Sequence, residues 1–150
     1  MQLGRNDDVT TLALGLMWRL SQEWFAGRRG RLSVYGEASI GQWRVDDGSR
    51  ATVTQLGVTP VARYWLPRGE RWFAELGVGG HLLAPVYRTR DKRFSTVFNF
   101  GDHIALGRQH GNGHRWEWSV RLQHFSNAGI ERPNPGEDFV QLRLALPLGR

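Results

Sequence analysis

The feature of this sequence that most constrains its fold is a regular alternation of apolar and polar residues in seven separate segments. Segment 10–20 shows it clearly, because every second residue from Leu12 to Leu20 is Leu or Trp. Side chains two residues apart share one face of a strand, whereas in a helix they scatter around the cylinder. The alternation therefore predicts strands over residues 10–20, 31–45, 52–66, 71–83, 95–108, 115–126 and 138–148.

The connections between these segments are short and rich in turn-forming residues. Asp-Asp-Gly-Ser at 46–49, Pro-Arg-Gly-Glu at 67–70 and Gly-Asn-Gly at 111–113 are typical hairpin turns. Seven antiparallel strands leave an odd count, while bacterial outer-membrane barrels have an even number of strands. We therefore expect residues 1–3 to be the end of an eighth, N-terminal strand that is truncated in this chain, and residues 4–8 to form the turn after it.

The two faces of the predicted strands indicate which side lies inside. The apolar faces are rich in Leu, with Trp and Tyr near the strand ends, as in the aromatic girdles of outer-membrane barrels. The opposite faces combine small residues with charges of both signs, which suits ion pairs in a crowded barrel interior. These charges include Glu37, Arg63, Glu75, Glu117, Arg121 and Arg143.

Together with strand lengths of about ten residues, which match a tilted membrane crossing, this pattern predicts an all-β fold. We expect an antiparallel eight-stranded transmembrane β-barrel that forms a single domain over residues 1–150. The reverse assignment, with Leu and Trp inside, describes a soluble lipocalin-like lipid-binding barrel and stays open as an alternative.

The composition restricts which classes of partner and cofactor this chain can bind. The chain has no cysteine, which excludes a disulfide framework and a thiolate metal site. Its net charge of +6 suits either nucleic acid or an anionic membrane surface. No recognised nucleic-acid-binding motif is present, so we expect no nucleic-acid partner. The histidines at 81, 103, 110 and 114 lack metal-ligand spacing with carboxylates, and we expect neither a metal nor a cofactor.

The residues that carry candidate chemistry lie near the end of the segment 115–126. His124 and Ser126 are two residues apart and therefore share a strand face. A serine hydroxyl becomes a nucleophile when a base takes its proton, and histidine is the usual base near neutral pH. Asp138 has the parity of Val140 and can face the same way on the next strand, as the residue that orients the base. Glu137 has the opposite parity but adjoins a loop, so it remains an alternative acid.

The surroundings of this pair matter for the interpretation. Asn127, Ala128 and Gly129 follow the serine, and a turn there can offer backbone N–H groups or the Asn amide as an oxyanion hole. His124 and Ser126 continue the apolar face, so we expect them on the lipid-facing wall, where polar groups are costly unless they have a function. A His-x-Ser at a strand end is more often an ordinary exposed pair without a catalytic function. A non-catalytic outer-membrane barrel, either an inactive relative or a structural porin-like protein, therefore stays open.

The run His-Phe-Ser-Asn-Ala-Gly-Ile at 124–130, followed by Arg-Pro-Asn-Pro-Gly at 132–136, resembles the signature of the PagL family of lipid A 3-O-deacylases. Weaker likeness extends through residues 73–79 and 98–102. The resemblance implies an outer-membrane barrel that is a serine esterase and removes the 3-O-linked acyl chain of lipid A without a cofactor. It also implies that His124 is the base and Ser126 the nucleophile, with residues 127–129 as the oxyanion region.

This sequence departs from the family at the acid, which is typically Glu and here is Asp138. Because Asp is one methylene shorter, either the loop moves closer or Glu137 takes its place. By strand counting, a basic loop falls on the same side as the candidate site, where it can contact the phosphates of lipid A. Its residues are Arg88, Arg90, Lys92 and Arg93.

The resemblance places the protein in the bacterial outer membrane, with lipid A or lipopolysaccharide and outer-membrane lipids as its partners, and leaves a homodimer open. No signal peptide is visible at the start of the sequence, because Met1 to Arg5 lacks a basic start followed by an apolar core. We expect the signal peptide to lie upstream or to have been removed.

Overall fold

The computed structural model describes residues 1–20, 24–27, 30–46, 51–67, 71–111 and 116–147. It consists of strands and connecting loops, and no helix among these residues is long and apolar enough to span a membrane. The strands are β1 (Gln2–Arg5), β2 (Val9–Arg19), β3 (Trp24–Gly27), β4 (Gly30–Val45), β5 (Thr52–Trp65), β6 (Trp72–Ala84), β7 (Phe98–His110), β8 (Trp116–Ser126) and β9 (Glu137–Ala145).

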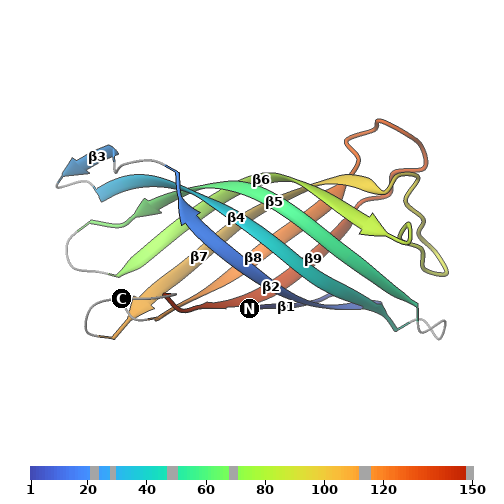
Figure 1. The fold of residues 1–150 in the computed structure, drawn as a ribbon, viewed down its shortest axis with the longest axis horizontal. Helices are drawn as coiled ribbons and strands as arrows, with labels where there is room; N and C mark the ends of the chain where they lie inside the picture. Colours follow the sequence, from blue (N-terminus) through green and yellow to red (C-terminus); the bar gives the residue numbers. More distant parts are fainter. Residues whose placement is uncertain (21–23, 28–29, 47–50, 68–70, 112–115, 148–150) are drawn as a thin grey trace.

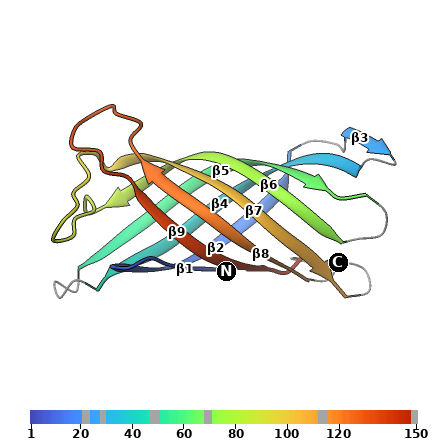
Figure 2. The same cartoon turned by 180° about the vertical axis from the view of Figure 1, so that it is seen from behind.

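All of these strands except β3 form one closed, antiparallel, eight-stranded barrel (Figures 1 and 2). Neighbours in the sequence are neighbours in the sheet from β4 to β9, and β2 pairs with β4. The short β1 closes the barrel because it pairs with β2 on one side and with β9 on the other. The short β3 pairs with the beginning of β4 alone and lies at the end of the barrel opposite the long loops.

The seven alternating segments correspond to β2 and to β4 through β9, with ends shifted by a few residues. The predicted eighth strand is present as β1, but the turn expected at 4–8 was placed too early, because the strand continues through Arg5. Gly4 faces the interior, where a Cβ would lie 2.6 Å from side-chain atoms of both Gln141 and Thr11. Position 4 is thus a glycine because the strand interior has no room for a side chain there, and not because the chain turns. The predicted turn residues at 47–49, 68–70 and 112–113 lie outside the described residues.

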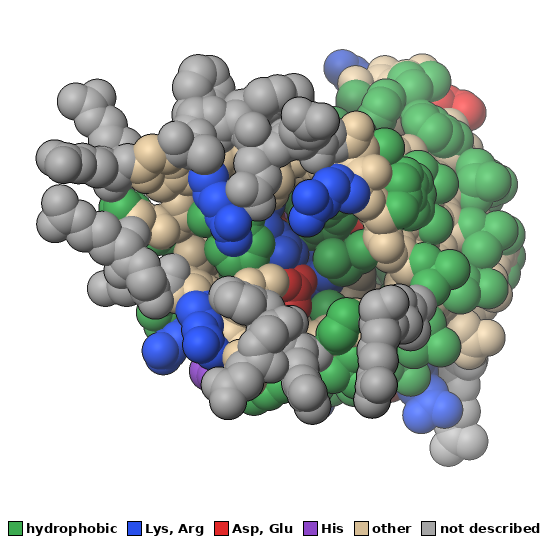
Figure 3. Space-filling view, turned by 60° about the vertical axis from the view of Figure 1, so that its left-hand side comes forward, with side chains coloured by type: hydrophobic (Ala, Val, Ile, Leu, Met, Phe, Trp, Pro, Cys, Tyr) green, Lys and Arg blue, Asp and Glu red, His purple; other side chains and the backbone are tan. Residues whose placement is uncertain are grey.

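The prediction that the apolar faces point outward is confirmed. Large apolar side chains cover the outer wall, and Leu14, Ile104 and Leu122 are each more than half exposed. Figure 3, which looks obliquely at the end that carries β3, shows this apolar wall and, inside the mouth, basic and acidic groups. Polar and charged side chains are thus buried inside while the large apolar ones face outward, which excludes the lipocalin-like arrangement.

Six buried charges fill the middle of the barrel as a connected network of three arginines and three glutamates. Arg63 contacts Glu75 at 2.5 Å and Glu117 at 2.7 Å. Arg121 lies 2.9 Å from Glu37, and Arg143 lies 2.8 Å from Glu117. Because each charge has opposite charges beside it, the network offsets the desolvation cost of burying these groups. It also ties β4, β5, β6, β8 and β9 together across the interior.

The β6–β7 loop and the β8–β9 loop lie at the same end of the barrel, as the strand count predicts (Figures 1 and 2). The Ser95 hydroxyl of the first loop donates to the Pro133 carbonyl of the second at 2.8 Å. Below the loops, Trp43 packs edge-to-face against Tyr87, Phe125 and Phe139, with ring centroids 4.8–5.2 Å apart. This aromatic cluster fills the barrel at the end where the candidate site lies.

Candidate active site

His124 and Asp138 meet on the outer wall of the barrel. The antiparallel register of β8 and β9 places them directly opposite each other. Nδ1 of His124 lies 2.7 Å from Oδ1 of Asp138, and their side chains are 45 % and 84 % exposed. With the proton on Nδ1, the imidazole donates to the carboxylate, and Nε2 is left as an acceptor. A carboxylate in this place fixes both the tautomer and the orientation of a histidine base.

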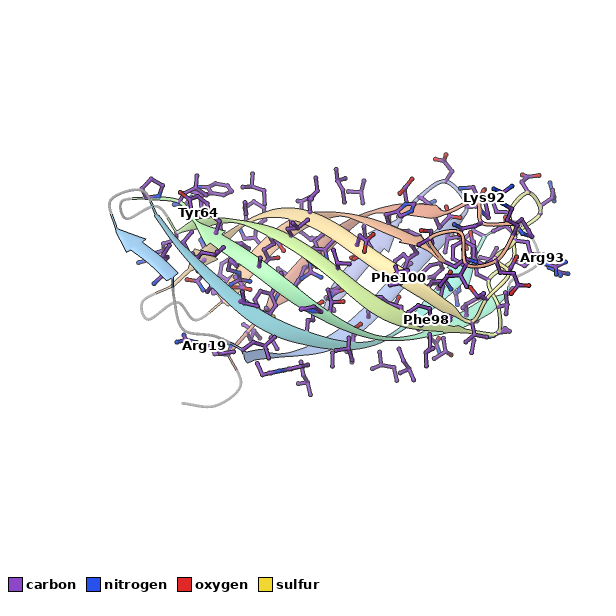
Figure 4. All side chains as sticks on the ribbon, turned by 90° about the horizontal axis from the view of Figure 1, so that it is seen from above. Arg19, Tyr64, Lys92, Arg93, Phe98 and Phe100 are labelled. Atoms are coloured by element: carbon purple, nitrogen blue, oxygen red, sulfur yellow. The ribbon has the colours of Figure 1, made fainter. Side chains whose placement is uncertain are left out.

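Ser126 is the last residue of β8 and lies on the same outward face, two residues beyond His124. Its neighbour across the β7 ladder is Phe100, which Figure 4 shows near the loop end of the barrel. The Ser126 hydroxyl accepts a long hydrogen bond of 3.5 Å from the Ala128 N–H. Among the described residues no hydrogen bond joins Ser126 to His124. Catalytic contacts of this kind are often loose without substrate.

The three residues after Ser126 form a tight turn. Ala128 and Gly129 both have positive φ, 52° and 80°, and the Ile130 N–H donates to the Asn127 carbonyl at 3.0 Å. The buried Asn127 side chain is used within the loop, because it donates to the Glu131 carbonyl and accepts from the Gly129 N–H. The Asn127 N–H also has a partner, the side chain of Asn134 at 3.0 Å.

Of the three residues predicted to form the oxyanion hole, the turn therefore leaves the Ala128 N–H directed at the serine. Asn127 and Gly129 shape the turn that aims it. A non-glycine residue with positive φ is uncommon and costs free energy, so Ala128 is held there by its surroundings.

Gly136 is a part of the site that sequence reasoning missed. It has a φ of 70°, and a Cβ at this position would lie 2.8 Å from Cε1 of the His124 ring. The Pro-Gly pair at 135–136 signals a turn, but nothing in the sequence shows that the turn lies against the imidazole. The absence of a side chain here lets the loop lie beside the His124 ring.

Glu137, the alternative acid, points the other way. It is buried in the barrel, where it accepts hydrogen bonds from Tyr87 at 2.7 Å, Asn6 at 2.6 Å and Lys92 at 3.1 Å. Its carboxylate thus lies on the opposite side of β9 from His124. Burial raises the pKa of the Tyr87 phenol well above its ordinary value, and the hydrogen bond to Glu137 adds to this effect. Tyr87 therefore stays protonated and able to donate.

A second carboxylate, Asp102, also neighbours the base. It faces His124 across the β7–β8 ladder, so the row across the wall reads Asp102, His124, Asp138. One oxygen of Asp102, Oδ1, is buried and has no hydrogen-bond partner among the described residues. The contact that the structure makes with the imidazole is with Asp138.

The four basic residues of the β6–β7 loop differ in what they contact. Arg88 and Arg93 pair as an isolated antiparallel bridge, and both are exposed, as is Arg90. Lys92 instead reaches Glu137 and lies over the barrel end, while Arg93 extends outward (Figure 4). The exposed arginines are thus better placed than Lys92 to meet an external anion. In the described part of the chain, no group of three or more His, Asp or Glu residues could hold a metal ion.

The sequence and fold match those of known proteins. A family model described as lipid A 3-O-deacylase (PagL) matches residues 11–147. The chain is 42 % identical over 120 residues to the lipid A deacylase PagL of Bordetella bronchiseptica, an alignment that covers 79 % of this chain and 64 % of that protein. It thus spans slightly less than two thirds of that relative.

Two further matches cover more of the proteins concerned. The chain is 31 % identical over 139 residues to the lipid A deacylase PagL of Pseudomonas aeruginosa, which covers 92 % of this chain and 78 % of that protein. A crystal structure of the outer membrane enzyme PagL superimposes with a TM-score of 0.79 at 27 % identity, covering 99 % of this chain and all of that one. The protein therefore belongs to the lipid A 3-O-deacylase (PagL) family.

Proposed function

We propose that this protein is a serine esterase that hydrolyses the 3-O-linked acyl chain of lipid A. The observation that carries the proposal is the 2.7 Å contact between His124 and Asp138, with Ser126 two residues away on the same outward face. Three groups with the chemistry of nucleophile, base and orienting acid thus share an apolar wall, which is where a membrane lipid would meet them.

In the first half of the reaction, the Ser126 hydroxyl attacks the ester carbonyl carbon while Nε2 of His124 takes the hydroxyl proton. Asp138 accepts the hydrogen bond from Nδ1–H and stabilises the imidazolium. The Ala128 N–H donates to the oxyanion of the tetrahedral intermediate. The carbon–oxygen bond to the sugar then breaks, His124 returns its proton to the departing sugar oxygen, and the acyl group remains on Ser126.

In the second half, a water molecule takes the place of the sugar. His124 removes a proton from the water as its oxygen attacks the acyl carbonyl. The bond between the acyl carbon and the Ser126 oxygen breaks, and His124 returns the proton to that oxygen. The products are a free fatty acid and the regenerated serine, and both protons pass through His124.

The location of the site supports lipid A as the substrate. The apolar wall below Ser126 would contact acyl chains, and the arginines of the β6–β7 loop lie at the same end and would bind phosphates. We place the protein in the bacterial outer membrane, with its long loops on the lipopolysaccharide side. In that orientation the ester reaches Ser126 without leaving the membrane.

Mass spectrometry of lipid A incubated with the detergent-refolded protein tests this function. We expect the loss of one hydroxyacyl chain from position 3, and no loss with the variant Ser126→Ala. Unchanged lipid A with the folded wild-type barrel would show a non-catalytic barrel of the same fold. Equal deacylation by Ser126→Ala would remove the proposed mechanism while leaving the activity.

A further inference from the structure

Asp138 lies at a weakly supported point of the barrel. Its side chain is 84 % exposed, so packing does not hold it in place. β9 begins one residue earlier, at Glu137, where its ladder with β8 starts. On the other side, the ladder between β1 and β9 runs from Arg143 to Val140 and does not reach Asp138. Strand ends with few backbone partners fray, so another contact must keep this carboxylate opposite His124.

The side chain of Asn6 supplies that contact. Asn6 follows the last residue of β1, and its Nδ2 donates to the Asp138 carbonyl at 3.1 Å and to Oε1 of Glu137 at 2.6 Å. Its Oδ1 accepts from the N–H groups of Asp8 at 3.1 Å and Val9 at 2.8 Å. The amide thus extends the β1–β9 ladder past the end of β1, and the turn between β1 and β2 holds it from behind.

Glu137 holds the start of β9 from the barrel interior. Its buried carboxylate accepts from Asn6, from Tyr87 and from Lys92, so three separate segments converge on it. Tyr87 is itself packed between Trp43 and Phe94, with ring centroids 5.2 Å and 5.0 Å away. Since side chains alternate along a strand, anchoring Glu137 inside the barrel obliges Asp138 to point outward, toward His124.

We propose that Asn6 and Glu137 are positioning residues that hold the backbone of β9 so that Asp138 stays in hydrogen-bond contact with His124. The proposal rests on the catalytic role proposed for Asp138. Neither residue touches the substrate: each acts through Asp138. A small misplacement of a catalytic group lowers the rate steeply. The contacts of Asn6 and Glu137 would therefore affect kcat more than they affect substrate binding.

The variant Asn6→Ala tests the proposal in the refolded, lipid-solubilised protein. We expect kcat to fall roughly ten- to hundredfold with KM unchanged, because the substrate-facing wall and loops are intact. The proton resonance of the His124 Nδ1–H bonded to Asp138, which lies downfield of the backbone amides, should broaden or disappear. Thr10→Val is the matched control: it removes a 3.1 Å side-chain hydrogen bond to Asp46 at the same end of the barrel, and this bond involves neither Asn6 nor Glu137.

Glu137→Gln provides an independent variant, because it keeps the volume but turns one acceptor oxygen into a donor that faces Asn6, Tyr87 or Lys92. It should also lower kcat and weaken the same resonance. The proposal is overturned if both variants keep wild-type kcat and the resonance, or if Thr10→Val lowers kcat equally. If the wild type is inactive on lipid A, the proposed function fails first; the resonance then still reports whether Asn6 and Glu137 position Asp138.

Discussion

His124 has a carboxylate on each side, and only one of the two is in hydrogen-bond contact with its ring in the described part of the chain. Asp138 on β9 is 2.7 Å from Nδ1, whereas Asp102 on β7 is its ladder neighbour and makes no hydrogen bond with it among the described residues. A base is oriented by the group that accepts its Nδ1–H, so the geometry supports Asp138 as the orienting acid of the proposed mechanism.

This assignment predicts unequal effects of two matched substitutions. Asp138→Asn should lower kcat by about two to four powers of ten, because the amide no longer accepts the Nδ1–H or stabilises the imidazolium. Asp102→Asn, the same change on the other side of the ring, should lower kcat by less than tenfold. Steady-state kinetics on lipid A measures both, and a larger loss from Asp102→Asn would reverse the assignment.

Two glycines of the β8–β9 loop allow a second comparison. Both have positive φ, but a Cβ at Gly136 would meet the His124 ring, while a Cβ at Gly129 would meet nothing within 4 Å. Each change to Ala should cost about 1 kcal/mol of backbone strain. Gly136→Ala should in addition displace the base and lower kcat roughly tenfold or more. Equal kcat values for the two variants would show that the space beside His124 has no catalytic importance.

At the scale of single residues, sequence reasoning gave the shared face of the candidate residues but not their finer contacts. The shared face of His124, Ser126 and Asp138 follows from strand parity, and the structure places all three side chains outward. Which acid touches the base depends on the register between β8 and β9, which the sequence does not show. Gly136 lies against the imidazole, and Asn6 donates hydrogen bonds to Glu137 and Asp138. Each of these contacts joins residues far apart in the chain, so no local pattern could indicate them.

Among the elements, the β6–β7 loop carries the exposed charges that the proposed substrate would meet. Arg88 and Arg93 are paired by an isolated backbone bridge, and both side chains are exposed. Replacing both with Gln should raise KM for bisphosphorylated lipid A about tenfold and leave KM for the dephosphorylated lipid unchanged. A KM that rises equally for both lipids would mean that the loop binds something other than phosphate.

The strands themselves are stabilised from inside by buried ion pairs. Arg121 is almost fully buried and contacts Glu37 and Glu75, so Arg121→Met leaves both carboxylates without that partner. We expect a loss of about 3–5 kcal/mol in the free energy of unfolding. Urea unfolding in detergent micelles measures it, with the exposed Arg132→Met as a control that should change by less than about 0.5 kcal/mol. A neutral Arg121→Met would show that the network carries little of the stability.

The elements were predictable because one face of each strand meets lipid and the other meets the barrel interior, which imposes a period of two residues. The alternation predicted all of the long barrel strands, β2 and β4 through β9. It could not give β1 its full extent, since Gly4 reads as a turn residue until its crowded interior position is known. The short β3 carries too little sequence to show an alternation.

On the scale of the whole molecule, a polar, ion-paired interior and an apolar outer wall define the environment of the proposed reaction. The proposed nucleophile, Ser126, lies on the outer wall, so the proposed substrate would approach from the surrounding lipid, with the packed interior as a support. The aromatic cluster under the loops, together with the hydrogen bonds of Asn6 to Glu137 and Asp138, connects that support to β9. In the proposed mechanism, this connection would hold the catalytic group in place on a membrane-facing wall.

The most direct test of this account is covalent trapping at the outer wall. A long-chain alkyl fluorophosphonate, added to the protein in lipid vesicles, should add its phosphonyl mass to the peptide that contains Ser126. The label should be lost in Ser126→Ala and strongly slowed in His124→Asn, because the serine then lacks its base. A phosphonyl group on any other residue, or equally fast labelling without His124, would contradict the claim that Ser126 and His124 form the catalytic centre.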